Sequence, residues 1–327
     1  MNIKAITPNR LLHDSSVLEI RPSASRMRIV CNEAPSQILL SVVTPISKMA
    51  GRLQRLEQWL TRVATFQMEV ILIHDRQDEV TGPQVQSLLS KISNPKIQLI
   101  EDYFGGPGLA RNRGIELAKG KWLCFWDSDD LPNLEVALSL IDKDSSSKAD
   151  CLITNFNSVN EMSNEVIAHQ PMANFEDELG LNPGLWRIFF KSNTIADLRF
   201  VPLRMAEDQI FLAEYFSKSR EVEIVSDTTY SYFFGESFHL TKNSSALNDL
   251  ALATTESSRI LRNLGNQKQN LAANMFVKQV ISGIRYGDLK TKRVVITQYM
   301  KSLLTSSKTV RNSVLSSSLK AIAAKVK

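Results

Sequence analysis

One stretch of the sequence, KWLCFWDSDD at residues 121–130, constrains the fold more than any other. Its apolar run is not interrupted by polar residues and ends on Asp127, Asp129 and Asp130. Such a run is typical of a strand that is buried on both faces and places its last residues at the edge of a sheet. Three carboxylates gathered there repel one another unless a cation lies among them, and aspartate oxygens suit Mg²⁺ or Mn²⁺. The stretch therefore predicts a divalent metal site at the end of a buried strand.

Two earlier runs repeat the pattern of a strand that ends on a polar residue. Residues 38–45 are rich in β-branched and aliphatic residues and close on Thr44-Pro45, and residues 69–75 close on Asp75. Apolar residues at helical spacing follow each run, so strands alternate with helices. This alternation predicts parallel βαβ units, and ligands bind beyond the carboxyl ends of the strands in such sheets. We therefore expect Thr44, Asp75 and Asp127 to face one crevice.

Composition argues against a disulfide-dependent protein and against a membrane-spanning one. With 327 residues, of which 43% are apolar and 22% charged, the chain can bury a large core without disulfides. The three cysteines are odd in number and form no CxxC pair, which favours a reducing compartment. No signal-peptide pattern opens the chain, and no window approaches ~18 uninterrupted apolar residues. We therefore expect a cytoplasmic protein that does not span a membrane.

Charge is distributed unevenly along the chain. Residues 241–327 hold 15 Lys or Arg and three acids, a balance of +12, so the net charge of +5 leaves −7 for residues 1–240. From about Leu247 the sequence has a helical pattern, and an apolar stripe runs from Val310 to Val326. A basic helical region predicts attraction to the inner face of an anionic membrane or to a partner enzyme. The alternative is an ordinary solvated helix face.

Five segments, taken in order, resemble the signature of family 2 glycosyltransferases. They are Thr44-Pro45, His74-Asp75, the run LARNRGIELAKG at residues 109–120, DSDD at residues 127–130, and Glu207-Asp208 after an Arg-Phe-x-Pro segment. A DxD triplet alone is a weak signal, but an RNxG segment just before a strand that ends in DSDD is quite specific. The resemblance covers roughly residues 38–235.

The resemblance implies a fold and a domain organisation. The expected fold is α/β, a single GT-A-type nucleotide-diphosphosugar transferase domain with a mixed, mainly parallel central sheet. This domain would occupy residues 38–240. An N-terminal extension at residues 1–37 would precede it, and a basic helical C-terminal region at residues 241–327 would follow it.

Carried over residue by residue, the resemblance implies a site for a UDP-sugar donor. Thr44 and Pro45 would line the nucleotide pocket, Asp75 would recognise the uracil ring, and Arg111 would lie near the base and phosphates. The family usually has two acids followed by Gly-Ser after the second strand, whereas this chain has His-Asp-Arg-Gln at residues 74–77. The histidine of that segment is expected to be packed in the protein rather than catalytic.

The other implied roles concern the metal and the acceptor. Asp127 and Ser128 would bind the donor, Asp127 and Asp129 would hold Mn²⁺ or Mg²⁺, and Asp208 would deprotonate the acceptor hydroxyl. A divalent ion stabilises a leaving diphosphate as a Lewis acid, and a positioned carboxylate base contributes roughly 10²- to 10⁴-fold. In a single displacement the base must lie opposite the leaving group, so we expect inversion at the anomeric carbon.

Three residues near these positions each have two interpretations. Asp130 is either a third acid of the metal site or the cap of the next helix. Arg111 either serves the donor or only pairs with a nearby acid such as Glu116. Trp186 either belongs to the core or stacks on a sugar ring.

The expected function is transfer of a single sugar from a UDP-sugar to a hydroxyl of a glycan or lipid-linked acceptor in cell-surface polysaccharide synthesis, without nucleic acid as a partner. The QxxRW motif of processive synthases is absent. One alternative is a nucleotidyltransferase of similar fold, for which Lys48–Arg52 is a faint counterpart of a triphosphate loop. Another is a degenerate transferase-like binding or assembly subunit, which the altered residues 74–77 favour. Loops, chiefly residues 157–184, are expected to select the sugar and acceptor.

Overall fold

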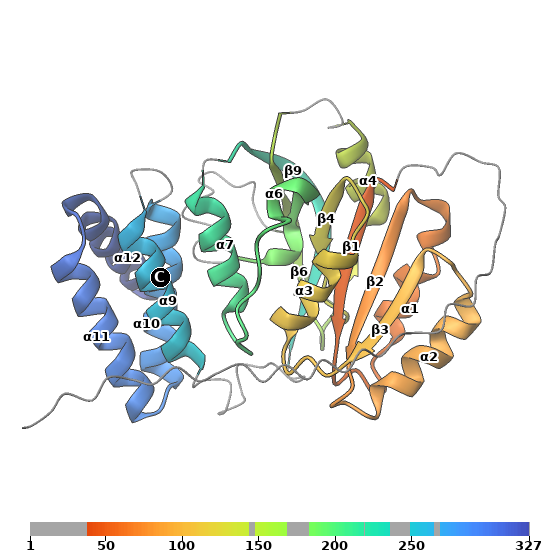
Figure 1. Ribbon diagram of the computed structural model, residues 1–327, viewed down its shortest axis with the longest axis horizontal. Coiled ribbons are helices and arrows are strands. Elements are labelled where there is room, and N and C mark those ends of the chain that lie inside the picture. The colour runs from red at the N-terminus through yellow and green to blue at the C-terminus, as the bar shows by residue number, and fades with distance from the viewer. Residues whose placement is uncertain are drawn as a thin grey trace, which may run out of the picture. The chain divides into compact units, whose positions relative to one another are not determined.

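Figure 1 shows the computed structural model of the protein, which describes residues 38–143, 148–168, 183–218, 220–235, 249–264 and 269–326. These residues all belong to one compact unit, residues 37–327. The N-terminal extension expected at residues 1–37 lies outside the described residues, as do residues 169–182 of the expected loop.

A single mixed sheet contains the strands of the described residues. They are β1 (Leu40–Ile46), β2 (Met68–Asp75), β3 (Ile97–Asp102), β4 (Trp122–Phe125), β5 (Leu131–Pro132), β6 (Cys151–Asn160), β7 (Val166–Ala168), β8 (Ile188–Lys191) and β9 (Val222–Phe234). Their order is β3-β2-β1-β4-β8-β6-β9-β5, and β7 pairs with β6. Strands β3, β2, β1 and β4 are mutually parallel, whereas β8 runs antiparallel to both β4 and β6. The parallel half therefore carries the strand ends that the sequence singled out.

Helices pack on both faces of this sheet or continue beyond it (Figure 1). They are α1 (Gln54–Leu60), α2 (Thr81–Ile92), α3 (Pro107–Leu117), α4 (Leu134–Lys143), α6 (Ser192–Ile195), α7 (Glu207–Ser217), α9 (Asp249–Asn263), α10 (Gln269–Tyr286), α11 (Leu289–Thr305) and α12 (Lys308–Val326). Two short 3₁₀ helices, Val63–Thr65 and Leu185–Arg187, lie before β2 and β8.

The two faces of the sheet have separate hydrophobic cores. Successive side chains of a strand point to opposite faces, and β1 follows this rule. Val42 belongs to the core that contains Trp59 of α1, whereas Val43 belongs to the core that contains Ile115 of α3 and Phe211 of α7. Helices α1, α2 and α4 therefore cover one face, and α3 and α7 cover the other.

The last helices extend the α3–α7 side of the protein. Leu250 of α9 and Met275 of α10 share a core with α7. A third core joins Phe276 of α10 to Val310 and Val314 of α12. Among the described residues, no helix is both long enough and apolar enough to cross a membrane.

Most of the secondary structure expected from the sequence is confirmed, including strands at residues 38–45, 69–75 and 122–126 and helices in the last part of the chain. One expectation is wrong: residues 157–168 are not a loop, because β6 continues to Asn160 and pairs with β7 in a hairpin. Polar residues predominate at the end of β6, a composition that a surface loop and an exposed strand share.

Candidate active site

The parallel strands bring the predicted site residues to one edge of the sheet. Val43 of β1 lies beside Phe125 of β4, and both strands run toward the same edge as β2. Thr44 is fully buried near the end of β1, and Asp75 is the last residue of β2. Asp127 lies two residues beyond the end of β4, after Trp126. The three strand ends therefore lie at one edge of the sheet, and the crevice expected there stays a prediction.

Arg111 of α3 occupies the centre of the site. Its Nη1 donates a hydrogen bond to Oε1 of Glu207 at 2.7 Å, and its Nη2 donates to Oδ1 of Asp127 at 3.2 Å. The residue is only 8% exposed, and its guanidinium carbon lies 5.6 Å from the centre of the Phe200 ring. Arginine suits this place because its planar fork can bridge two carboxylates while its face rests on an aromatic ring. One side chain thus joins the DSDD segment to the acidic pair that begins α7.

The alternative that Arg111 pairs with Glu116 is wrong. Arg113 makes that pair instead, at 3.0 Å, on the exposed side of α3. The two arginines lie two residues apart in a helix, and such residues point in different directions. The sequence showed both arginines but gave no signal that Glu207, almost a hundred residues later, is the partner of Arg111.

The rest of the RNxG segment fixes α3 against its neighbours. The Asn112 amide donates to the Phe200 carbonyl at 2.9 Å and accepts from the Phe200 backbone N–H at 2.7 Å. Gly114 faces Val43 of β1 so closely that a β-carbon would lie 2.2 Å from a γ-carbon of Val43. Arg111 therefore contacts the acidic cluster, and Asn112 binds the segment before α7. Gly114 lets α3 pack closely on the sheet.

Four acids and Arg111 share an electrostatic cluster. Burial raises the pKa of Asp127 to about 6; Arg111 opposes the rise, and Asp129 and Asp208 add to it. Burial, and next the charge of Asp208, raise the pKa of Glu207 to about 7 against the opposing effect of Arg111. The structure therefore brings Asp208 into the electrostatic range of Asp127, although 81 positions separate them in the sequence.

The backbone just before Glu207 is strained. Ala206 precedes α7 with φ of 64°, in the left-handed region that residues with a β-carbon seldom adopt. A left-handed conformation costs a non-glycine residue about 1–2 kcal/mol. The surrounding contacts compensate for this cost and fix the direction in which Glu207 and Asp208 leave the backbone.

Asp130 is held by β9 and does not cap the helix that follows it. It is 1% exposed, and its Oδ2 accepts from the Tyr230 hydroxyl at 3.0 Å while its Oδ1 accepts from the Phe233 backbone N–H at 2.7 Å. The Tyr230 hydroxyl also accepts from the backbone N–H of Asp127 at 3.0 Å. Asn133, whose Oδ1 accepts from the Val136 N–H, takes the place of the cap. Asp130 thus fastens the DSDD segment to β9, a role for which the sequence offered no partner.

The carboxylates suit a metal ion whose coordination is completed by a substrate. No three His, Cys, Asp or Glu side chains in the described ranges are grouped closely enough to enclose an ion. Asp127 and Asp129 are half-buried, whereas Asp130 is occupied by β9. Mg²⁺ is commonly bound by one or two carboxylates together with substrate phosphates and water rather than by an all-protein cage. This donor set therefore suits an ion that arrives with a diphosphate.

The end of β2 is shaped by two side chains. Asp75 Oδ2 accepts from the Gly105 N–H at 2.8 Å, and its Oδ1 accepts from the Gln77 N–H at 3.0 Å, which orders the loop before α3. His74 is 2% exposed, and its ring nitrogens lie 3.1 Å from a Glu101 carboxylate oxygen and 3.0 Å from a backbone carbonyl oxygen. The expectation that His74 is packed in the protein is confirmed.

Trp186 belongs to the core. Its ring stacks on Tyr230 with centroids 4.8 Å apart and on Tyr232 with centroids 5.5 Å apart. Phe156 meets it edge-on at 4.5 Å, and only 8% of the residue is exposed. The interpretation of Trp186 as a platform for a sugar ring is therefore wrong.

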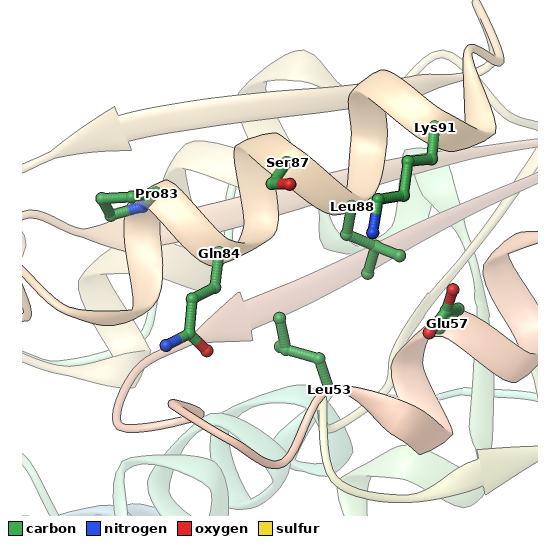
Figure 2. Close-up of a pocket in the computed structure, with 7 residues that line it drawn as sticks. All are labelled: Leu53, Glu57, Pro83, Gln84, Ser87, Leu88 and Lys91. Carbon is green, nitrogen blue, oxygen red and sulfur yellow. The ribbon is translucent and has the colours of Figure 1, made fainter.

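A separate groove of about 360 Å³ lies between α1 and α2 (Figure 2). Leu53 and Glu57 line it from the side of α1, and α2 contributes the rest: Pro83, Gln84, Ser87, Leu88 and Lys91. These helices cover the face of the sheet opposite α3, and none of the predicted site residues lines the groove. The groove is therefore not part of the acidic cluster.

Residues 41–216 match the family described as Glycosyl transferase family 2. This chain belongs to glycosyl transferase family 2. The family and the GT-A-type fold expected from the sequence are thus confirmed, and the family 2 match covers every predicted site residue.

Two proteins illustrate the similarity of this family 2 chain to known ones. The poly(ribitol-phosphate) beta-N-acetylglucosaminyltransferase TarS of Staphylococcus aureus is 29% identical over 179 residues, which cover 51% of this chain and 30% of TarS. The chain thus matches less than a third of the length of that relative. The crystal structure of TarS 1-349 with UDP-GlcNAc aligns with a TM-score of 0.64 at 15% identity, covering 88% of this chain and 91% of that one.

A mannosyltransferase from Pyrobaculum calidifontis, in complex with GDP-Man and Mn²⁺, aligns with a TM-score of 0.50 at 13% identity over 89% of this chain and 87% of that one. At such low identities these structural likenesses show the fold.

Proposed function

We propose that this family 2 chain transfers a single sugar from a UDP-sugar to a hydroxyl of a glycan or lipid-linked acceptor in cell-surface polysaccharide synthesis. The observation that carries the proposal is the contact of Arg111 with both Asp127 and Glu207, because it brings the DSDD segment and the Glu207-Asp208 pair into one cluster. A relative named for transfer of N-acetylglucosamine to poly(ribitol-phosphate), and a similar fold crystallised with UDP-GlcNAc, support this donor and acceptor class.

The proposed donor site lies at the carboxyl edge of the parallel strands. Thr44, Pro45 and Asp75 line its nucleotide end, and Ser128 with Asp127 lies at the ribose and diphosphate end. In this assignment residues 38–240 form the catalytic domain and residues 1–37 an N-terminal extension. Residues 241–327 form a helical region, of which α9 and α10 pack on α7.

The proposed metal ligands are Asp127 and Asp129. A divalent ion such as Mn²⁺ or Mg²⁺ between them would offset the negative charge that grows on the leaving diphosphate. Arg111 donates a hydrogen bond to Asp127 and restricts the orientation of its carboxylate. The neighbouring Ser128 is buried, so the backbone between the two acids is fixed by packing.

The proposed base is Asp208. Its helix, α7, contacts Arg111 through Glu207, whereas the segment after β4 contacts Arg111 through Asp127, so the proposed base and the proposed metal ligands come from different segments. Glu207 is bound to Arg111 and is therefore a positioning residue, whereas Asp208 is half-buried and accepts from the Gln209 backbone N–H. Removal of the acceptor proton by Asp208 as the hydroxyl attacks would give inversion at the anomeric carbon.

The test is release of UDP from a panel of UDP-sugars by purified protein, with Mn²⁺ or with a chelator. We expect release that requires the metal, and a decrease of roughly 10²- to 10⁴-fold for Asp208→Asn. Asp197→Asn, an exposed aspartate outside the cluster, is the matched control and should retain full activity. UDP should still raise the melting temperature of Asp208→Asn, because the base does not bind the donor.

Three outcomes would contradict the proposal. A product that retains the donor configuration, as seen by NMR of the anomeric proton, would remove Asp208 from the role of base. Equal release of UDP with Mn²⁺ and with a chelator would exclude a role for the metal. Stabilisation by UDP without any release of UDP would favour the degenerate binding subunit over the enzyme.

A further inference from the structure

Helix α11 exposes an apolar stripe on the side that faces away from the protein. Thr291, Val295 and Ser302 form its buried side. Four large apolar side chains lie roughly opposite, at the helical spacing of about 3.6 residues per turn, and are 47–75% exposed: Leu289, Ile296, Met300 and Leu304. A helix that only packs on its neighbours needs one apolar side, so the second apolar side of α11 requires an explanation.

Helix α12 repeats this arrangement. Val310, Val314 and Ser317 are buried, and the two valines contribute to the core with α10. Leu315, Leu319 and Ile322 are 44–68% exposed. The stripe expected between Val310 and Val326 is therefore divided between an inward and an outward side. Single exposed apolar residues are ordinary, but seven of them on two consecutive helices form a concentration that marks an interaction surface.

The charges on these two helices have one sign. No Asp or Glu occurs between residues 289 and 326, whereas eight Lys or Arg do. Six of the basic residues are exposed: Lys290, Arg293, Lys301, Lys308, Arg311 and Lys320. The first 240 residues carry a balance of −7, so attraction to an anionic surface comes from the last helices rather than from the chain as a whole.

We infer that α11 and α12 dock this chain on an anionic lipid bilayer, with their outward leucine, isoleucine and methionine side chains in the headgroup region and their basic residues on the lipid phosphates. Helices that lie in a membrane interface combine an apolar side with lysine and arginine at its borders, and each basic residue adds attraction to anionic lipid. Surfaces that bind proteins are instead depleted in lysine. This inference is independent of the proposed catalytic function.

The experiment is flotation of the full chain with vesicles in a density gradient. Vesicles of phosphatidylcholine alone are compared with vesicles of equal parts phosphatidylcholine and phosphatidylglycerol, at low and at high salt. We expect binding to the anionic vesicles only, and weaker binding at high salt because salt screens exposed charges.

Two variants test the two kinds of side chain. The triple variant Arg293→Gln, Lys301→Gln, Arg311→Gln removes three charges, each contributing about fivefold, so partition should fall about 100-fold. Its control removes three exposed charges from the rest of the chain: Lys91→Gln, Lys148→Gln, Lys218→Gln. This control should change partition by less than about twofold, since distant charges are screened.

The second variant, Leu304→Gln with Leu319→Gln, removes two of the most exposed apolar side chains of the two helices. Partition should fall by about tenfold or more for each leucine that enters the interface. Its control is Val80→Gln with Met162→Gln, which are 60% and 73% exposed on other elements and should have no effect. Melting temperatures of all four variants should match the wild type, because exposed substitutions leave the cores intact.

Failure of the wild type to float with anionic vesicles, or equal flotation of the test and control variants, would overturn the inference. Oligomers that appear in sedimentation and are lost in the leucine variant would also overturn it, by assigning the surface to a second copy of the chain. Release of UDP in solution does not depend on vesicles, so a failure here is distinct from a failure of the proposed function.

Discussion

Replacement of Arg111 by methionine tests whether this arginine holds the acidic cluster together. The variant keeps much of the side-chain volume but removes the hydrogen bonds to Glu207 and Asp127. Glu207 is 6% exposed, and at pH 8, where its carboxyl is ionised, removal of one partner of a buried ion pair typically costs about 3–5 kcal/mol. At about 2–4 °C per kcal/mol for a domain of this size, the melting temperature should fall by about 6–20 °C.

The matched control is Arg113→Met on the same helix. Arg113 also pairs with a glutamate, Glu116, but both side chains are 46% exposed, and such pairs contribute about 0–1 kcal/mol. Thermal unfolding followed by fluorescence and by circular dichroism should therefore separate the two variants clearly. Equal shifts for both would refute the argument, because they would mean that burial adds nothing to the pair that Arg111 forms.

A double variant shows where the cost arises. If the uncompensated carboxylate of Glu207 destabilises Arg111→Met, then Glu207→Gln added to that variant should restore stability, with a coupling of about 1–3 kcal/mol. Additive effects would instead assign the loss to packing of the arginine against Phe200. The same proteins should lose UDP release, since Asp127 is then no longer oriented.

Three further results are expected. Gly114→Ala should destabilise the protein by about 3 kcal/mol despite the better helix propensity of alanine, because its β-carbon would meet Val43 at 2.2 Å; a rise in melting temperature would contradict the close packing of α3 on β1. Between pH 4.5 and about 7 the folded protein binds more protons at Glu207 than the unfolded chain does, so the contribution of Glu207 to stability should decrease as pH rises. The melting temperature of the wild type should therefore fall relative to that of Glu207→Gln across this window. A constant difference between the two melting temperatures would show that the pKa of Glu207 is not raised. Tyr230→Phe, which removes two buried hydrogen bonds of the DSDD segment, should cost about 1–3 kcal/mol in chemical unfolding, whereas Tyr103→Phe at an exposed position should cost nothing.

The sequence predicted those features that depend on residues close together in the chain. Apolar runs gave the strands of the parallel half of the sheet, and their last residues gave the edge where Thr44, Asp75 and Asp127 lie. Periodicity also gave the helices of the last region. These features could be predicted because the spacing of apolar residues along a short stretch of chain distinguishes a strand from a helix.

Partners that come from distant segments could not be predicted in this way. Nothing near Arg111 indicates that Glu207 completes its contacts, and nothing near Asp130 indicates Tyr230, which lies 100 residues later. Asp208 was assigned through the family resemblance rather than through local pattern, since an acid at the first turn of a helix is common for reasons of helix stability alone. The hairpin at β6 and β7 was missed because its polar residues resemble those of a loop.

The RNxG segment shows why a short motif can be more specific than the DxD triplet that follows it. Within one turn of α3, each residue points to a different part of the fold: Arg111 to the acidic cluster, Asn112 to the backbone of Phe200, and Gly114 to β1. Lysine at the first position could not bridge two carboxylates through a planar fork, and any β-carbon at the last would push α3 from the sheet. The two aspartates of a DxD triplet do not have to meet such a set of contacts, so the triplet alone is less specific. The position of the proposed catalytic acids therefore depends on α3, because three separate segments must meet at one helix turn.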